Sequence, residues 1–226
     1  MRNKEVSSEE VVKAHLERIE EVNPKLNAVV LLTAESALHQ AREADAALAR
    51  GEIKGPLHGV PVTIKDNIET AGVVSTSGTK GRSSFVPAHD ATVAARMWAA
   101  GAIMLGKTNL PEFGLAFETD NLVYGRTNNP YDLSRTPGGS SGGEAAIIAS
   151  GGSPLGLGND MGGSIRLPSH FCGLAGIKPT TDRVPRTGHF PPPLTGLDPL
   201  WQAGPMARRV EDLILTLPII ARVDWR

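Results

Sequence analysis

The sequence predicts an α/β protein, in which short strands and helices build a sheet with long functional loops. Two observations carry this prediction. Stretches with the apolar periodicity of helices alternate along the chain with short strand-like runs, and glycine and proline separate them. The chain has 226 residues, of which 40% are hydrophobic and 21% are charged. This is enough for one sizeable core, so we expect a single domain over residues 1–226.

The first fifty residues predict a helix, a strand and a second helix. Ser7 and Glu10 form a capping box ahead of an apolar stripe, so a helix should begin there and run to about residue 22. Pro24 should end this helix, because proline lacks the N–H that a helix interior needs. Residues 26–32 then indicate a strand, and the alanine-rich residues 33–51 indicate the second helix.

Lys65 is expected at the end of a strand. Val60, Val62 and Ile64 alternate along the chain as they would in a strand, and a loop follows. Functional groups are often found where a sheet gives way to a loop. The remaining elements are expected to be a helix at 91–100, a buried strand at 102–105, irregular chain at 107–139, a helix at 144–150, a strand at 154–157, a helix opening at Ser164, and a helix at 207–221 kinked by Pro218.

Composition narrows the classes of partner. Lysine and arginine total 23 against 24 acidic residues, so there is no electrostatic case for a nucleic-acid or anionic-membrane partner. No apolar signal region or bilayer-length apolar run is present, and we expect a cytoplasmic location. Cys172 is the only cysteine, which excludes an internal disulfide and a cysteine-based metal site. We expect it to be a small buried side chain, and we expect no cofactor and no metal.

Two motif matches point to other chemistry but lack the structural context that each motif needs. Residues 101–108 satisfy GxxxxGK[ST], yet a helix is predicted before them, their spacers are apolar and a loop follows, so a buried strand is expected. Residues 138–142 satisfy the GxSxG nucleophile elbow, with Asp160 and then His170 or His189 downstream for a triad. No apolar strand precedes that serine, which weakens this interpretation.

Two glycine-flanked serines and one distant lysine carry the strongest chemical signal. Residues 138–143 read GGSSGG and residues 162–166 read GGSIR, which places Ser140 and Ser164 in one segment downstream of Lys65. A serine hydroxyl needs a base to become a nucleophile. A lysine can be that base only when neutral, and burial lowers its pKa in that direction. We therefore expect an acyl-transfer site in which Ser140 relays a proton between Ser164 and Lys65.

The glycines indicate a place for developing negative charge. The backbone N–H groups of Met161, Gly162 and Gly163 lie at a predicted helix start, where they can converge on an oxyanion. Side chains at the glycines would obstruct a substrate carbonyl. A flexible Gly-Ser linker is the alternative, but linkers are not set between apolar runs such as residues 145–149 and 165–167.

At these residues the sequence closely resembles the amidase signature family. The matching run covers residues 137–180, and GPLHGVPVTIKDN, GAIMLGKTNLPEFG and GPMARRVEDL are similar to further family segments. The resemblance implies a mixed β-sheet covered by helices on both faces. It also implies a Ser–cisSer–Lys triad, with Ser164 as the acyl-enzyme nucleophile, Ser140 after a cis peptide as proton relay, and Lys65 as base. The oxyanion positions implied are Met161, Gly162 and Gly163, and the supporting residues implied are Ser141, Asp160 and Arg166.

The chain also departs from the family pattern. Met161 stands where many members carry a small polar residue, and Asn159 stands where threonine is common. Members are generally much longer, whereas this sequence stops at Val223-Asp-Trp-Arg226. We therefore expect a domain that lacks the C-terminal part of the family fold and leaves an open strand edge and exposed apolar surface. Weak or no activity alone, or dependence on self-association into a homo-oligomer, should follow.

The leading prediction is an amidohydrolase that cleaves the C–N bond of a small or aryl carboxamide through an acyl-enzyme. The small amide would be its partner, with no nucleic acid and no membrane. The nearest alternative is an A-type subunit of a glutamine-dependent amidotransferase, which releases ammonia from glutamine. A third is an inactive amidase fragment. Glu144, directly after GGSSGG, and the absence of a partner signal favour the stand-alone hydrolase.

Overall fold

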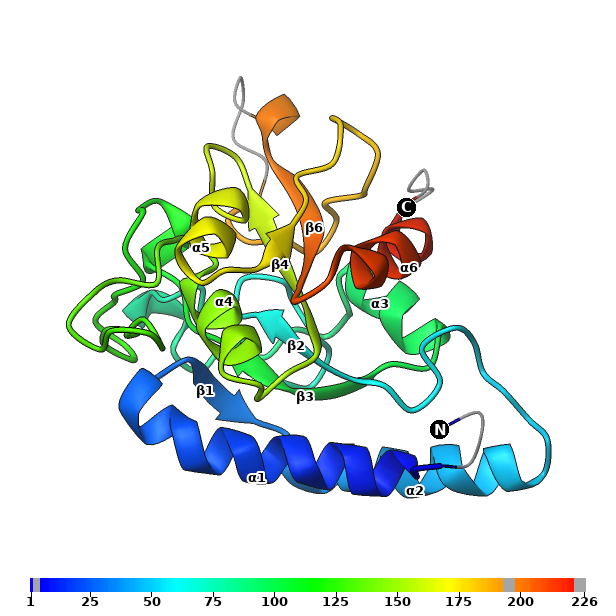
Figure 1. The fold of residues 1–226 in the computed structure, drawn as a ribbon. Helices are drawn as coiled ribbons and strands as arrows, with labels where there is room; N and C mark the ends of the chain where they lie inside the picture. Colours follow the sequence, from blue (N-terminus) through cyan, green and yellow to red (C-terminus); the bar gives the residue numbers. More distant parts are fainter. Residues whose placement is uncertain (2–4, 193–197, 222–226) are drawn as a thin grey trace.

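Strands in the described residues form one mixed sheet in the order β1-β3-β2-β4-β6-β5 (Figure 1). The computed structural model describes residues 1, 5–192 and 198–221, so the expectation about the last four residues falls outside it. The strands are β1 Val29–Leu32, β2 Pro61–Lys65, β3 Ile103–Thr108, β4 Leu155–Asp160, β5 Ala175–Gly176 and β6 Gln202–Ala207. Strand β2 is parallel to both of its neighbours, whereas β1, β6 and β5 join by antiparallel pairing.

Helices cover both faces of this sheet, which confirms the predicted fold class (Figure 1). The α-helices are α1 Ser8–Leu26, α2 Ala34–Ala49, α3 Thr92–Ala99, α4 Gly142–Ala149, α5 Arg166–Phe171 and α6 Val210–Ile220, and short 3-10 helices are η1 Lys80–Arg82, η2 Glu112–Gly114 and η3 Asp198–Leu200. One core packs α3 and α6 against the sheet, and a second packs α1, α2 and α4 against the sheet. Burial of both faces explains why β2, β3, β4 and β6 have no exposed residue.

Helix α1 begins at the predicted capping box but does not stop at Pro24. The Ser7 side chain accepts a hydrogen bond from the Glu10 N–H at 3.0 Å, and the Glu10 carboxylate accepts one from the Ser7 N–H at 2.8 Å. Pro24 lies in the last turn, where it gives up one N–H bond to the preceding turn without stopping the helix, and Asn27 closes the helix in the left-handed conformation. The expected end at Pro24 was therefore wrong by one turn.

Strand β6 is the longest strand that the sequence pattern does not reveal. Residues 202–207 read QAGPMA, which has no β-branched residue and contains Pro205. The strand nevertheless lies between β4 and β5, with Pro205 opposite Leu157 and its carbonyl accepting from Ile177 N–H at 3.3 Å. Pairing with distant strands outweighs the weak local propensity here. The helix expected from residue 207 consequently begins at Val210.

Candidate active site

Strand β2 delivers Lys65 to the face of the sheet that α4 covers. Val62 and Ile64 belong to the core on the opposite face, so the two-residue period of a strand turns Thr63 and Lys65 toward α4. The Lys65 side chain is fully buried. Burial lowers its pKa from 10.5 to about 7, although the charges of Asp160 and Glu144 partly oppose the change. Near neutral pH this amine is therefore able to act as a base.

Ser140 lies against this amine. The Lys65 Nζ atom is 2.6 Å from Ser140 Oγ. The peptide bond between Gly139 and Ser140 is cis, at the position that the family resemblance implied. Gly139 is needed here because a Cβ on it would come within 2.9 Å of the Ala116 carbonyl oxygen. The loop before α4 thus places one serine hydroxyl directly on the buried lysine.

The second serine loop contacts the first through the backbone. The Ser141 N–H donates to the Ser164 carbonyl oxygen at 3.0 Å, and the Ser141 hydroxyl donates to the Asn159 carbonyl at 3.3 Å. The Ser164 residue is 7% exposed. Among the described residues, its hydroxyl makes no hydrogen bond. The structure therefore brings Lys65 and Ser140 into direct contact and places Ser164 beside them, without a bond between the two serine hydroxyls.

Asp160 organises the loop that carries Ser164. Its carboxylate accepts two bonds from the Arg166 guanidinium, both at 2.9 Å. It also accepts from the N–H groups of Gly163 at 2.8 Å and Ile165 at 3.0 Å. Burial alone would raise the pKa of Asp160, but these donors outweigh it and lower the pKa to about 2. Asp160 therefore stays ionised and holds the serine loop in shape.

The Met161–Gly163 segment is only partly free to bind an oxyanion. The Gly163 N–H already donates to Asp160 Oδ1 at 2.8 Å, so Met161 and Gly162 are the positions left for this role. Gly162 is exposed, and a Cβ on it would meet nothing within 4 Å. The space beside Gly162 is therefore open.

Glu144 is a buried link between α4 and the sheet rather than a group facing a substrate. Its carboxylate accepts from the hydroxyls of Thr63 on β2 and Thr108 on β3, the latter at 2.7 Å. It also packs against Gly156 on β4, where a Cβ would lie 1.7 Å from Glu144 Oε1. Burial raises its pKa to about 7, against the bonds from both threonines. The position of Glu144 after GGSSGG therefore gives no support to the stand-alone hydrolase.

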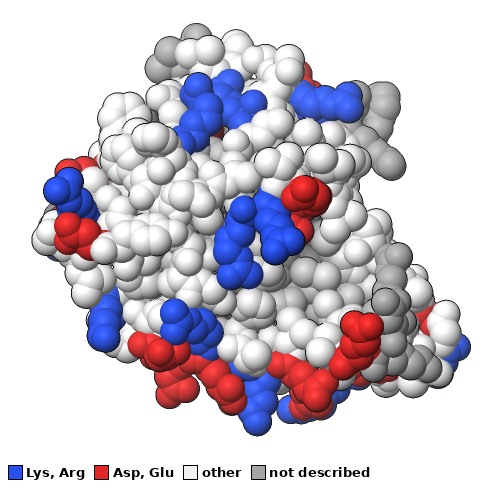
Figure 2. Space-filling model, viewed as in Figure 1, with Lys and Arg blue, Asp and Glu red and all other residues white. Residues whose placement is uncertain are grey.

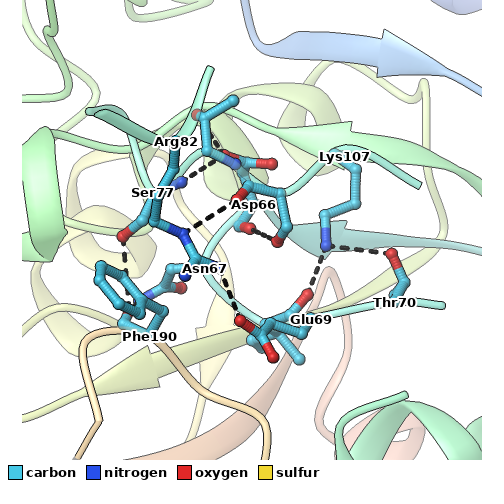
Figure 3. A network of polar contacts seen from close by, with 11 residues as sticks. Asp66, Asn67, Glu69, Thr70, Ser77, Arg82, Lys107 and Phe190 are labelled. Atoms are coloured by element: carbon cyan, nitrogen blue, oxygen red, sulfur yellow. Dashed lines mark hydrogen bonds and ion pairs between the residues drawn. The ribbon is translucent and has the colours of Figure 1, made fainter. Parts of the chain in front are cut away.

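The two competing motifs do not form their sites. Residues 103–108 of the phosphate-loop match are strand β3, and Lys107 is fully buried, donating to the Ile68 carbonyl and to Thr70 Oγ1 at 3.3 Å (Figure 3). For the elbow triad, Asp160 bonds Arg166 instead of a histidine. His189 is buried, and its pKa is lowered to about 3 by burial and then by the charges of Lys65, Arg186 and Lys107.

Other expectations about single groups can be compared directly. Cys172 is buried, as predicted, and burial raises the pKa of its thiol to about 12. The described residues hold no group of three or more His, Cys, Asp or Glu side chains suited to a metal ion. Within the same part of the chain, no helix has the length and apolar character needed to cross a bilayer.

Two asparagines at the site were not recognised from the sequence. Asn159 Oδ1 accepts from Lys65 Nζ at 2.8 Å, and Asn159 Nδ2 donates to Asn67 Oδ1 at 2.9 Å. Asn67 follows Lys65 by two residues, and Asn159 precedes Asp160. Polar residues at the ends of adjacent parallel strands were the available signal, because such ends meet at one edge of a sheet.

Comparison with known proteins defines the class. The sequence model of the family described as Amidase matches residues 10–226, and this chain belongs to the amidase signature family. The fold agrees with solved members. The native peptide amidase of Stenotrophomonas maltophilia superposes with a TM-score of 0.92 at 35% identity, covering 100% of this chain and 47% of its own. The 6-aminohexanoate cyclic dimer hydrolase gives 0.87 at 37% identity, covering 99% and 45%.

Curated relatives of higher identity carry a more particular name. The A subunit of glutamyl-tRNA(Gln) amidotransferase from Carboxydothermus hydrogenoformans is 49% identical over 221 residues, which is 98% of this chain and 45% of that protein. The protein of the same name from Moorella thermoacetica is 47% identical over 224 residues, 99% of this chain and 45% of its own length. The chain thus spans about half the length of the curated relatives that it matches.

Proposed function

We propose that this chain carries the amide-hydrolysing site of a glutamine-dependent amidotransferase, as its A-type subunit. One observation carries the chemistry: a fully buried lysine, with a pKa near 7, lies 2.6 Å from a serine in a loop bonded to the second serine loop. The choice within the family rests on identity. The amidotransferase subunits reach 49% and 47%, whereas the peptide amidase and the cyclic dimer hydrolase reach 35% and 37%.

In the proposed acylation step, neutral Lys65 takes the proton of Ser140 while Ser140 takes that of Ser164. The Ser164 Oγ then forms a bond to the amide carbon, and the carbonyl π electrons move to oxygen. The Met161 and Gly162 N–H groups stabilise this oxyanion. Lys65 is now an ammonium, which the nearby Asp160 and Glu144 charges stabilise.

In the second half of the reaction, the oxyanion collapses and the C–N bond breaks. The Lys65 proton returns through Ser140 to the leaving nitrogen, which departs as ammonia when the substrate is glutamine. Water then attacks the Ser164 ester and the same relay accepts its proton. The bond between Ser164 Oγ and the acyl carbon breaks, the relay returns that proton to Ser164 Oγ, and the carboxylic acid leaves. Lys65, Ser140 and Ser164 are thereby restored.

The charge distribution supports a division of labour between subunits. On the face in Figure 2, Lys and Arg lie in separate groups, with acidic residues among them along the lower edge. The chain has 23 basic and 24 acidic residues. The face shown in Figure 2 therefore has no continuous basic stripe of the kind expected of a nucleic-acid footprint. We therefore propose that other subunits hold the glutamyl-tRNA that the relatives' name specifies, in the cytoplasm, while this chain supplies ammonia.

A stand-alone amidase for an apolar carboxamide is the second candidate, and one observation favours it. Phe117 is 58% exposed, and its Cε1 lies 4.0 Å from the point where a Cβ on Gly163 would stand. An aromatic side chain beside the serine loop suits an apolar acyl group.

Ammonia release from glutamine and from an aryl amide, each with and without partner subunits, tests the two candidates. We expect glutamine turnover that rises when partner subunits are added, and its complete loss in Ser164→Ala. A fluorophosphonate probe should label Ser164 in the wild type. Aryl amide turnover that exceeds glutamine turnover and ignores the partners would support the second candidate. Full turnover by Ser164→Ala would contradict both.

A further inference from the structure

We propose that Asn159 is a positioning residue for Lys65, and that the carbonyl of Phe190, acting through Asn67, fixes the direction in which Asn159 holds the amine. The proposal rests on the proposed function only for the consequence in catalysis. Its structural basis is a row of hydrogen bonds that runs from Lys65 through two side-chain amides to the backbone.

The row begins at a group that can only accept. Asn67 Nδ2 donates to the Phe190 carbonyl oxygen at 3.0 Å (Figure 3). A carbonyl has no proton to give, so the NH2 end of Asn67 must face it. The oxygen of Asn67 must then face the opposite way, toward Asn159. The Phe190 N–H in turn donates to the Asn67 carbonyl at 2.9 Å, which holds the two segments together.

The direction set at Phe190 passes to the second amide. Because Asn67 presents its oxygen, Asn159 has to present its NH2 group, and the two meet at 2.9 Å. The oxygen of Asn159 is thereby turned to Lys65 Nζ, 2.8 Å away. A neutral amine has two N–H groups and one lone pair. Asn159 takes one N–H, so the second N–H and the lone pair are left for Ser140, whose Oγ lies 2.6 Å from Lys65 Nζ.

A hydroxyl at position 159 would not impose this arrangement. A threonine hydroxyl, for example, both donates and accepts, so it would permit either direction. An amide oxygen accepts only. Both asparagines are buried, at 2% exposure for Asn159 and 0% for Asn67, so water does not compete for these bonds. This row of hydrogen bonds therefore orients the neutral Lys65 amine toward Ser140, and it adds no charge beside the amine.

Other groups also act on this amine, and the test must separate them from Asn159. Asp160, at the end of β4, and Glu144 on α4 stabilise the charged form of Lys65, and the buried His189 lies close enough for Lys65 to lower its pKa. None of the three makes a hydrogen bond to Lys65 Nζ in the described residues. Variants at Asn159 and Asn67 leave all three in place.

The first arm of the experiment tests the contact between Asn159 and Lys65 with a measurement that does not depend on catalysis. The purified protein is labelled with 13C at lysine Cε, and the Lys65 signal is assigned by its loss in Lys65→Met. In Asn159→Asp, we expect the titration midpoint of Lys65 to move upward by about 1–3 pH units, because a carboxylate replaces the neutral acceptor. An unmoved midpoint would overturn the contact on which the proposal rests.

The second arm measures alignment, through the rate at which a fluorophosphonate labels Ser164 across pH. Asn159→Leu and Asn67→Leu should each lower the high-pH plateau by about 10- to 100-fold, because Lys65 is neutral there and only its orientation has changed. The double variant should be no slower than the slower single variant. Unchanged plateaus, or losses that multiply in the double variant, would overturn the proposal that Asn67 and Asn159 act through one row of hydrogen bonds.

A control variant and the labelling of the wild type make the result specific to the Asn67–Asn159 pair. Asn23→Leu removes a side-chain amide that bonds Ala28 and Val29 at the end of α1 and makes no hydrogen bond to Lys65, Asn67 or Asn159, and it should leave the plateau unchanged while lowering the melting temperature. A wild type that is unlabelled at every pH, or labelled at another serine, would reject the proposed function. The Lys65 titration would then still decide whether Asn159 positions the amine.

Discussion

Lys65 occupies a position in which a lysine gains little by being charged. Its only hydrogen-bond partners in the described residues are the Ser140 hydroxyl and the Asn159 amide oxygen, both neutral. Burial is the largest influence on its pKa, and the charges of Asp160 and Glu144 only partly offset it. Two predictions about the pH dependence of the protein depend on this single side chain.

The first concerns the rate of acylation. Only the neutral amine accepts the serine proton, and its pKa is about 7. The fluorophosphonate labelling rate of Ser164 should therefore rise about tenfold per pH unit below the pKa and level off above it. Measured labelling between pH 5 and 9 checks this expectation, in about half-unit steps. A rate that falls as pH rises through 7 would show that Lys65 acts in its charged form.

The second concerns stability. The folded pKa of Lys65 is about 7 and the ordinary value is 10.5, so between them the unfolded chain binds a proton that the folded chain does not. Burial of Lys65 therefore lowers the free energy of unfolding by its full amount below pH 7, and this effect disappears above pH 10.5. Lys65→Met should raise the melting temperature relative to the wild type more at about pH 6 than at about pH 10. Equal differences at both pH values would contradict the lowered pKa.

Sequence chemistry identifies the catalytic candidates at this scale better than it identifies their surroundings. Lys65, Ser140 and Ser164 stand out because lysine and serine lie in distinctive glycine-rich contexts. Asn67 and Asn159 do not, since asparagine has many ordinary uses and its orientation depends on the Phe190 carbonyl far along the chain. The engagement of the Gly163 N–H by Asp160 is likewise a matter of three-dimensional geometry.

At the scale of elements, α4 fixes the site by joining three strands. Glu144 bonds Thr63 on β2 and Thr108 on β3 and packs on Gly156 of β4. The helix itself was predictable from its apolar run. Its attachment was not, because a glutamate after a glycine-rich loop suggests a surface or catalytic group. Strand β6 shows the same limit, since its pairing with β4 comes from packing and not from its own residues.

This attachment predicts a strong coupling between positions 144 and 156. A Cβ on Gly156 would lie 1.7 Å from Glu144 Oε1, so Gly156→Ala should lower the free energy of unfolding by about 1–3 kcal/mol or more. In a Glu144→Ala background the obstacle is absent and the same substitution should cost much less. Urea unfolding of the wild type, both single variants and the double variant measures the coupling.

Gly162→Ala is the matched control for this measurement. Nothing lies within 4 Å of the Cβ that it would add, so the free energy of unfolding should stay within about 0.5 kcal/mol of the wild type. Additive costs at positions 144 and 156 would show that the strand and helix adjust independently of each other.

At the scale of the whole molecule, α6 leaves large apolar side chains in water. Ile214 is 68% exposed and Val210 is 58% exposed, whereas Leu213 on the same helix is 8% exposed and belongs to the core. An exposed apolar cluster of this kind favours association with another surface. Within the residues that the structure describes, the exposed face of α6 is therefore a candidate contact surface.

A charge on this helix should affect association without affecting folding. Ile214→Lys should change the free energy of unfolding by less than about 0.5 kcal/mol, because the side chain is already exposed. It should reduce any self-association, measured by sedimentation velocity over a range of concentrations. Leu213→Lys is the control, since it places a charge in the core and should unfold the protein. Unchanged association in Ile214→Lys would remove α6 from the contact surface.

The distance along the chain between the reacting groups has a consequence for folding. Lys65 meets a serine 75 residues away and an asparagine 94 residues away. Closing loops of that length requires much of the sheet to be ordered first. The contacts of Lys65 with Ser140 and Asn159 should therefore form late in folding. Until then the amine is hydrated and holds its proton at neutral pH. In a nascent or partly unfolded chain, Lys65 therefore does not activate Ser164. Covalent labelling of Ser164 thus reports that the native topology is complete.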